Sequence, residues 1–508
     1  MSNFQFLVDW DNDGDFGDTG EDVTDYVIGA NWQIGFTEPD QHVAGETRLN
    51  LTLRNMDKRF SPENTSSPIY GDMLPQRRIK IQYVDGGTTE LYNGFIQHIN
   101  PAPGTRGDLR AHVNGVGIKQ FYERQSYYSP FWENVTADEV IADIVTEVQL
   151  PVVFNNFAYL DIPGQNLLDT HWLSDPDDFL MEETGYTRFP YVGDTWDDGV
   201  RAMQAINDLV QSERGWFFQS REGSVVFWNR HHLITNDTVL GTVDNSWVTL
   251  DYRYSASDIK NVVTVQAYPR AIGTATDEIL WALDEEETIA PGETKVFRVQ
   301  YSEQDSDSKV SGRNVTTPNI GDSSLVIDPS GVGFQLDVEE ENARSMRLSI
   351  ENTHTTDIVV TDMLVKGQKI TSYNEQELER SDPVSIGLYG RHEMRLDHRL
   401  INDTSFAGAI ADYELGQRKD PRAVVRAMKV NQRQPDFVVN RTIGDWVRVV
   451  DGQTDHDDEY VIMGEKWMWS PGDKFDVEYI LQPTSVHEFM FLDKVGKNVL
   501  DSGRYLAV

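Results

Sequence analysis

Residues Arg48–Arg54 read RLNLTLR, a run in which leucine takes every second position and polar residues fill the positions between. A period of two places the leucines on one face of a β-strand and leaves the other face polar. The same alternation occurs in RIKIQYV (78–84) and in LYNGFI (91–96), on either side of a turn at 85–87. The pattern predicts an antiparallel β-barrel or sandwich over residues 1–120.

An acidic loop precedes this run and reads DWDNDGDFGDTGE over residues 9–21. Acidic side chains on alternate positions before a glycine are typical of the first half of a calcium-binding loop. The position of the closing glutamate holds glycine, however, and the acid follows one residue later. Both flanks have the sequence pattern of strands, so a structural Ca²⁺ would stabilise a β-hairpin and would not drive a conformational change between helices. The candidate metal ligands are Asp9, Asp11, Asp13, Asp15 through its carbonyl, and Glu21.

The alternative for this loop is a solvated acidic turn without metal. Aspartate, asparagine and glycine favour turns for backbone reasons alone. Either way, we expect no catalysis by the loop.

The composition is that of a globular protein with several domains. A length of 508 residues suggests about three domains, and 39% hydrophobic residues are enough for a packed core in each. No run approaches the roughly 20 apolar residues that cross a bilayer, and the start of the chain lacks a signal-peptide pattern. We therefore expect neither stable membrane insertion nor export by the general secretory route. With no cysteine, the chain has no disulfide, thiolate zinc site or cysteine nucleophile.

The charge balance is strongly acidic. The chain has 44 basic and 83 acidic residues, for a net charge of −39. This argues against a surface that grips nucleic acid by neutralising phosphates. A negatively charged channel wall would instead let a polyanion pass without binding to it. The alternative explanation for the acidic composition is simple solubility or a salty habitat.

Helices are predicted in the middle of the chain, in an α/β domain of residues 121–257. Thr136 and Glu139 form a capping box ahead of an apolar helical face, and a second helix is expected from near Asp197 to Glu213. A hairpin over residues 216–228 should pack on that second helix. Residues 151–196 are acidic and aperiodic, and we expect an irregular excursion there.

The second half of the chain returns to strands. Residues 276–371 have the alternation and the loop composition of an inserted β-sandwich. Residues 258–275 and 372–485 are predicted to form a second barrel with one helix from Ser405 to Lys419, and residues 486–508 form a C-terminal tail.

The usual signatures of enzymes are missing from the sequence. It has no GxSxG elbow, Walker loop, HExxH or strand-linked GxGxxG, and no pair of carboxylates stands out as a glycosidase pair. Of the 12 tryptophans, Trp467 and Trp469 lie in strand patterns where core packing is expected, rather than a sugar-stacking surface. We expect no enzymatic activity.

Several segments along the chain, in order, carry a likeness to a known family. They are the opening strand with its aspartate-rich loop (8–15), the run 53–62 with Gly71 and 74–75 after it, 92–96, the capped helix at Thr136, the hairpin ending at 227–230, the strand 261–265, the pairs 352–353 and 366–367, and 389–391. Together they resemble the tail-tip hub and minor tail proteins of tailed bacteriophages. The resemblance covers most of the chain, least clearly residues 151–196.

The resemblance implies a fold that is mainly β with a smaller α/β part: two tube-like β-barrels, an intervening α/β domain and the inserted sandwich. It also implies a homotrimer at the distal end of the tail tube, in the virion, assembled in the host cytoplasm. Its partners would be the tail tube and distal tail proteins on the one hand and the tip, fibre or receptor-binding proteins on the other. The trimer would open so that DNA passes through its lumen without specific binding. The alternatives are an adhesin whose insert binds host glycans and, less favoured, a polysaccharide-degrading tail enzyme.

Overall fold

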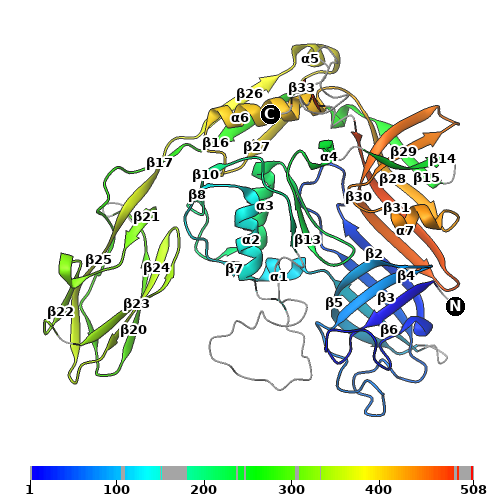
Figure 1. The fold of residues 1–508 in the computed structure, drawn as a ribbon. Helices are drawn as coiled ribbons and strands as arrows, with labels where there is room; N and C mark the ends of the chain where they lie inside the picture. The colour runs from blue at the N-terminus through cyan, green and yellow to red at the C-terminus, as the bar shows by residue number, and fades with distance from the viewer. Residues whose placement is uncertain are drawn as a thin grey trace.

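The computed structural model describes residues 3–104, 109–148, 150, 180–235, 238–244, 247–303, 308–331, 333–484, 489–490 and 505–506. Most of the expected irregular excursion and of the expected C-terminal tail lies outside the described residues. In Figure 1 the strands from the N-terminal part of the chain (blue) and from its C-terminal part (orange) lie together at the right. A helical part lies in the middle, and an elongated insert lies at the left. Within the described residues, no helix is both long and apolar enough to cross a membrane.

The largest element is one 12-stranded sheet to which both ends of the chain contribute. Its main path runs in the order β1-β4-β5-β6-β3-β2-β30-β31-β28-β15, and β29 adds to β30 and carries β14. The strands are β1 (Phe4–Val8), β2 (Val27–Gly35), β3 (Arg48–Arg54), β4 (Arg78–Val84), β5 (Thr88–Ala102), β6 (Arg110–Val116), β14 (Val239–Asp244), β15 (Trp247–Tyr254), β28 (Ala423–Asn431), β29 (Trp446–Asp451), β30 (His456–Ser470) and β31 (Lys474–Pro483). The leucines of β3 are buried and the residues between them are not, as the alternation predicts.

The sheet differs from the two tube-like barrels that we expected. In the described residues its path is open, because it ends at β1 and at β15. Strand β2 joins the two halves, because it pairs with β3 on one side and with β30 on the other. The N-terminal half approaches closure at a single bridge, Leu7 to Asp22, which two backbone hydrogen bonds flank. The mainly β fold is thus confirmed, whereas the two halves form one sheet with one shared core.

The helical part lies between this sheet and the insert. Its elements are α1 (Lys119–Arg124), β7 (Ser126–Tyr127), β8 (Trp132–Val135), α2 (Ala137–Glu147), β9 (Leu180–Glu182), β10 (Phe189–Val192), β11 (Val200–Arg201), α3 (Ala202–Glu213), β12 (Trp216–Gln219), β13 (Val225–Trp228) and α4 (His232–Thr235). The capping box at Thr136 is present at the start of α2. The second helix begins later than expected, because Val200 and Arg201 pair with β7 instead of joining α3.

The β12–β13 hairpin is buried on both of its faces. Phe217 and Phe227 belong to the core around α2 and α3, as predicted, whereas Trp216 and Phe218 belong to the core of the large sheet. Alternate residues of a strand point to opposite faces, so one short hairpin joins the two cores.

The insert consists of two sheets that share one core. Its strands are β17 (Arg270–Ile272), β18 (Glu278–Ala282), β19 (Glu287–Ile289), β20 (Thr294–Gln300), β21 (Ser311–Thr316), β22 (Leu325–Asp328), β23 (Phe334–Glu341), β24 (Ser345–Asn352) and β25 (Ile358–Ser372). The long strand β25 pairs with five of them, and β24 pairs with β20 and β23.

A separate three-stranded sheet lies next to the insert, at the end where the insert joins the rest of the chain. It consists of β16 (Val262–Ala267), β26 (Gln376–Ser381) and β27 (Glu393–Asp397), and α6 (Thr404–Arg418) packs on it. Asp403 caps α6, close to the predicted start of the helix. This half also contains two short helices, α5 (Pro383–Tyr389) and α7 (Pro435–Asn440), and a parallel pair of short strands, β32 (Phe489–Met490) and β33 (Tyr505–Leu506).

Candidate functional site at the strand junction

The two halves of the chain meet where β2 pairs with β30. Trp32 lies directly opposite Trp467, and their rings stack with centroids 5.2 Å apart and an interplanar angle of 8°. At the end of the junction Gly35 faces Gly464. A Cβ on Gly464 would lie 2.1 Å from the backbone oxygen of Phe36, so the close approach of the strands requires glycine there.

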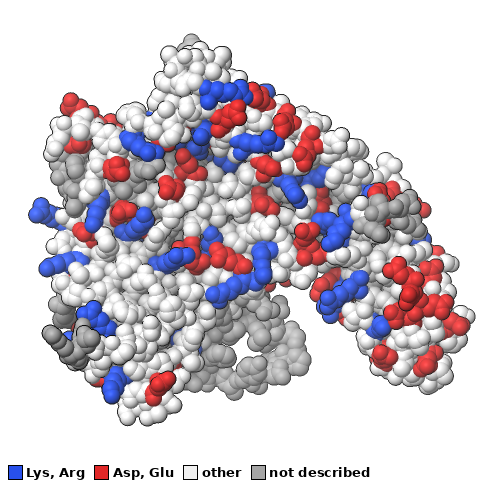
Figure 2. All heavy atoms as spheres, turned by 180° about the vertical axis from the view of Figure 1, so that it is seen from behind, with Lys and Arg blue, Asp and Glu red and all other residues white. Residues whose placement is uncertain are grey.

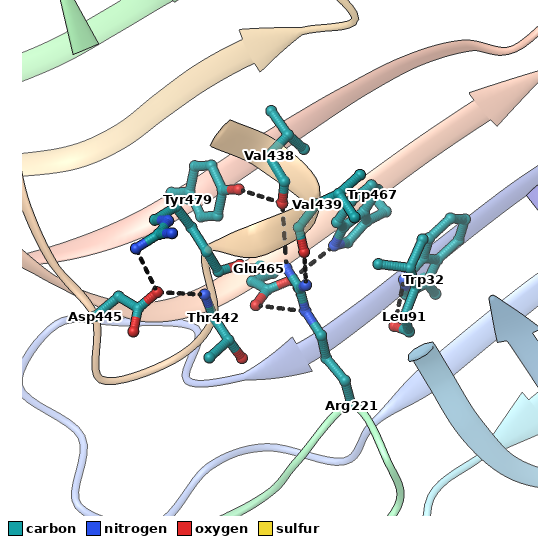
Figure 3. Close-up of polar contacts among 11 residues, drawn as sticks. Trp32, Leu91, Arg221, Val438, Val439, Thr442, Asp445, Glu465, Trp467 and Tyr479 are labelled. Carbon is teal, nitrogen blue, oxygen red and sulfur yellow. Dashed lines mark hydrogen bonds and ion pairs between the residues drawn. The ribbon is translucent and has the colours of Figure 1, made fainter. Parts of the chain in front are cut away.

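Arg221 reaches this junction from the turn of the β12–β13 hairpin (Figure 3). Its Nη2 and Nε donate to the Glu465 carboxylate of β30, with the shortest contact at 2.7 Å. Its Nη1 donates to the backbone oxygen of Val439 at 2.6 Å, and Nη2 also donates to that of Arg441 at 2.5 Å. These carbonyls belong to the C-terminal end of α7, where backbone oxygens lack partners within a helix.

The Arg221–Glu465 ion pair is buried. The side chains of Arg221 and Glu465 are 3% and 0% exposed. Trp467 donates its indole N–H to Glu465 at 2.7 Å, and its ring lies 5.4 Å from the guanidinium carbon of Arg221. Burial alone would lower the pKa of Arg221, but the charge of Glu465 and its hydrogen bonds outweigh burial, and the pKa is raised. One cation thus connects the hairpin, the helix α7 and the strand β30.

A second buried network ties the helical part to α6. Glu414 of α6 accepts from Arg214, the residue just after α3, at 2.7 Å and from Arg418 at 2.8 Å. Arg418 also pairs with Asp40, in the segment that follows β2, at 3.1 Å. Burial raises the pKa of Glu414, but the neighbouring charges of Arg214 and Arg418 outweigh it and hold the pKa at about 2. The site can therefore fix three parts of the chain relative to one another.

The acidic loop lies at the bridge that approaches closure of the N-terminal half. Oxygen atoms of Asp9, Asp11 and Glu21 lie within 4.8 Å of one another, and those of Asp11, Asp13 and Asp18 form a second such group. Asp18 was not among the predicted ligands. The side chain of Asp15 lies outside both groups and accepts from the backbone N–H of Gly17 at 2.7 Å.

Two carboxylates of this loop are buried close together. Burial raises the pKa of Glu21 to about 7 and also raises the pKa of Asp9. Backbone N–H groups of Trp10 and Asp18 donate to Glu21, so the loop is partly satisfied from within. Carboxylate oxygens are the ligands that Ca²⁺ prefers, and Asp9, Asp11 and Glu21 would hold the ion and lose their mutual repulsion. Calcium binding stays a prediction.

The sequence pattern predicts the hairpin over residues 216–228, which contains Arg221, but it does not indicate the junction. An arginine two residues before a glycine is common in exposed turns, and Glu465 and Glu414 are two acids among many. A weak signal was available: Glu465 stands in an otherwise apolar alternation beside Trp467, where an acid requires a buried partner. Trp467 and Trp469 are buried, which confirms the core packing expected for them.

Comparisons with known proteins give a match in structure but not in sequence. No protein-family model matches the sequence, and no curated protein matches it at a significant level. The tail protein from Neisseria meningitidis MC58 is similar in structure, with a TM-score of 0.50 and 9% identity over 96% of this chain and 98% of that chain. A prophage MuSo2 tail protein from Shewanella oneidensis has a TM-score of 0.48 and 10% identity over 95% and 99% of the two chains. A prophage tail protein from Listeria monocytogenes has a TM-score of 0.43 and 8% identity over 94% of each chain.

The similarity to the Neisseria tail protein extends over nearly the full length of both chains. At this identity it establishes the fold. The likeness to tail proteins that the sequence indicates is therefore confirmed at the level of the fold.

Proposed function

We propose that the chain is a structural virion protein that forms the central hub at the distal end of a phage tail. It would close the tail tube, hold tip or fibre proteins and open for DNA ejection. In this role a homotrimer surrounds the axis, and each protomer contributes both halves of its sheet to the ring.

The observation that carries this proposal is the continuous sheet across the β2–β30 junction. A ring that withstands the forces of ejection needs protomers that do not hinge between their two halves. Strand pairing, the tryptophan stack and the buried Arg221–Glu465 pair all oppose such a hinge. The full-length similarity in fold to a tail protein supports the same role.

The hub acts mechanically in this proposal and has no catalytic residues. Its neighbours are tail tube and distal tail proteins on one side and tip proteins on the other. The buried ion pairs at the junction serve rigidity and carry no proton transfer.

The composition of purified tailed particles tests the proposal. Quantitative mass spectrometry should find three copies of the chain per tail, or a multiple of three if protomers stack. Recovery of the chain only as a free monomer, absent from washed particles, would overturn it.

The insert favours a second, compatible role in attachment. It has its own core and projects from the rest of the molecule (Figure 1). The inferred role is to bind a partner protein or a host glycan. Binding of the full chain to host surface glycans, lost when residues 276–371 are replaced by a short linker, would support attachment, and unchanged binding by that variant would place the contact elsewhere.

A further inference from the structure

One face of the large sheet carries mostly polar side chains that are exposed or partly exposed. We call it the open sheet face, and it consists of the side chains of β6, β3, β2, the 464–470 part of β30, β31 and β28 that point away from the shared core. One row of register partners crosses all six strands: Asn114, Asn50, Asn31, Met468, Asp476 and Asn431. The row crosses the junction without a break, so both halves present one surface.

Amide side chains dominate this row and bond to one another across the strands. Asn50 donates to the side-chain oxygen of Asn31 at 2.9 Å, and Asn114 donates to that of Asn50 at 2.6 Å. Asn31, Asn50 and Met468 are exposed, with Met468 at 44%. The amides are thus held in place at the surface, and each keeps donors and acceptors for a passing ligand.

The charge of the open sheet face is the reverse of that of the chain. Its six strand segments contain three acids, of which Glu465 points into the core. The other two are paired: Asp476 with Lys429 at 3.3 Å and Glu478 with Lys466 at 3.1 Å. In contrast, acidic side chains crowd the insert, at the lower right of Figure 2.

Positive charge gathers at one end of the row. The exposed Arg433 and Lys474 line one groove together with Asn431, Met468 and Asp476. At the other end Arg48 and Arg124 line a groove with Asn50 and Asn114, where Glu46 and Glu123 balance the two positive charges. The open sheet face is therefore an amide surface with a basic end, in a chain with a net charge of −39.

We propose that the open sheet face is a weak contact surface for the phosphate backbone of duplex DNA, and that the Arg433–Lys474 groove is its strongest point. The inference rests on the proposed hub function and identifies the wall that DNA meets. Amides exchange hydrogen bonds with water and phosphate at little net cost, and two or three cations neutralise few phosphates, so DNA is contacted without being held. This face differs from the acidic wall that the net charge alone suggests.

Fluorescence anisotropy of a labelled duplex with the purified full chain tests the proposal. We expect weak binding at low salt that weakens by roughly 10- to 40-fold over a fourfold rise in salt, as two to three phosphate contacts require. Arg433→Glu with Lys474→Glu should abolish the binding, and Asn31→Asp with Asn50→Asp should weaken it at least about tenfold.

The matched control is Arg298→Glu with Lys309→Glu, which makes the same charge change at exposed positions of the insert. Binding that is absent at low salt, or that falls as much in the control as in the groove variant, would overturn the inference. Neither result would affect the hub function, which particle composition tests. Conversely, absence from particles would refute the hub and leave the measured DNA contact in place.

Discussion

Replacement of Arg221 is the sharpest test of how the β2–β30 junction is held together. Replacement by alanine leaves the Glu465 carboxylate, 0% exposed, without its cation. Breaking a buried ion pair from one side costs about 3–5 kcal/mol. The carbonyls of Val439 and Arg441 lose their donor as well, so we expect a loss of at least about 3 kcal/mol in the free energy of unfolding.

The loss should be local to the junction, and the assay has to resolve it. Several cores share this chain, so a single unfolding midpoint does not report on one of them. Amide hydrogen exchange of β2 and β30, followed by mass spectrometry, reads their opening free energy directly. Arg448→Ala is the matched control, because Arg448 pairs with Asp457 at 2.6 Å in the same sheet but both side chains are about half exposed. We expect no measurable change in that variant.

A double variant separates the ion pair from simple loss of volume. Arg221→Met with Glu465→Gln removes both charges and keeps an acceptor for Trp467, so it should recover part of the loss. If Arg221→Ala accelerates exchange in β2 and β30 no more than Arg448→Ala does, the junction is not held by this pair and the reasoning fails.

Three further predictions concern the acidic loop and the close approach of the strands. Chelation of calcium should lower the thermal midpoint at which the large sheet unfolds, because bound calcium adds about 2.7 kcal/mol to the free energy of unfolding when free calcium stands at 100 times Kd. Asp11→Ala should abolish that sensitivity, and an unchanged midpoint refutes a structural ion. Without calcium, the raised pKa of Glu21, from 4.5 to about 7, means that the folded state binds the proton more tightly, so stability should fall as pH rises from about 4.5 to about 7, and Glu21→Gln should flatten this slope in pH-dependent denaturation. Gly464→Ala places a Cβ against Phe36 and should cost about 1–3 kcal/mol or more by denaturant unfolding, whereas Gly29→Ala, with nothing within 4 Å, should be tolerated; equal effects would contradict the packing described.

Much of the local structure follows from the sequence because local patterns determine it. The alternation in Arg48–Arg54 and in Arg78–Val84 coincides with β3 and β4 to the residue. The capping box before α2 is likewise a local device, and it forms as predicted. The second helix was predicted about five residues too early, because a short strand pairing at Val200 prevails over helical periodicity.

The junction could not be predicted in the same way. Its partners are far apart in sequence: Trp32 meets Trp467, and Arg221 meets Glu465. Nothing in the sequence of β2 specifies which strand pairs with its second edge, so the single sheet that joins the two halves was not predicted. The acidic loop shows the same limit, because the spacing did not indicate Asp18, which the fold brings to the cluster.

The place of the chain in a native particle tests the central claim most directly. Immunogold labelling of tailed particles from the organism that encodes the chain, with antibody against the purified protein, locates it by electron microscopy. The hub proposal predicts label at the distal tip of the tail and on no other part of the particle. Label along the tube, on the capsid or only on soluble material would contradict it.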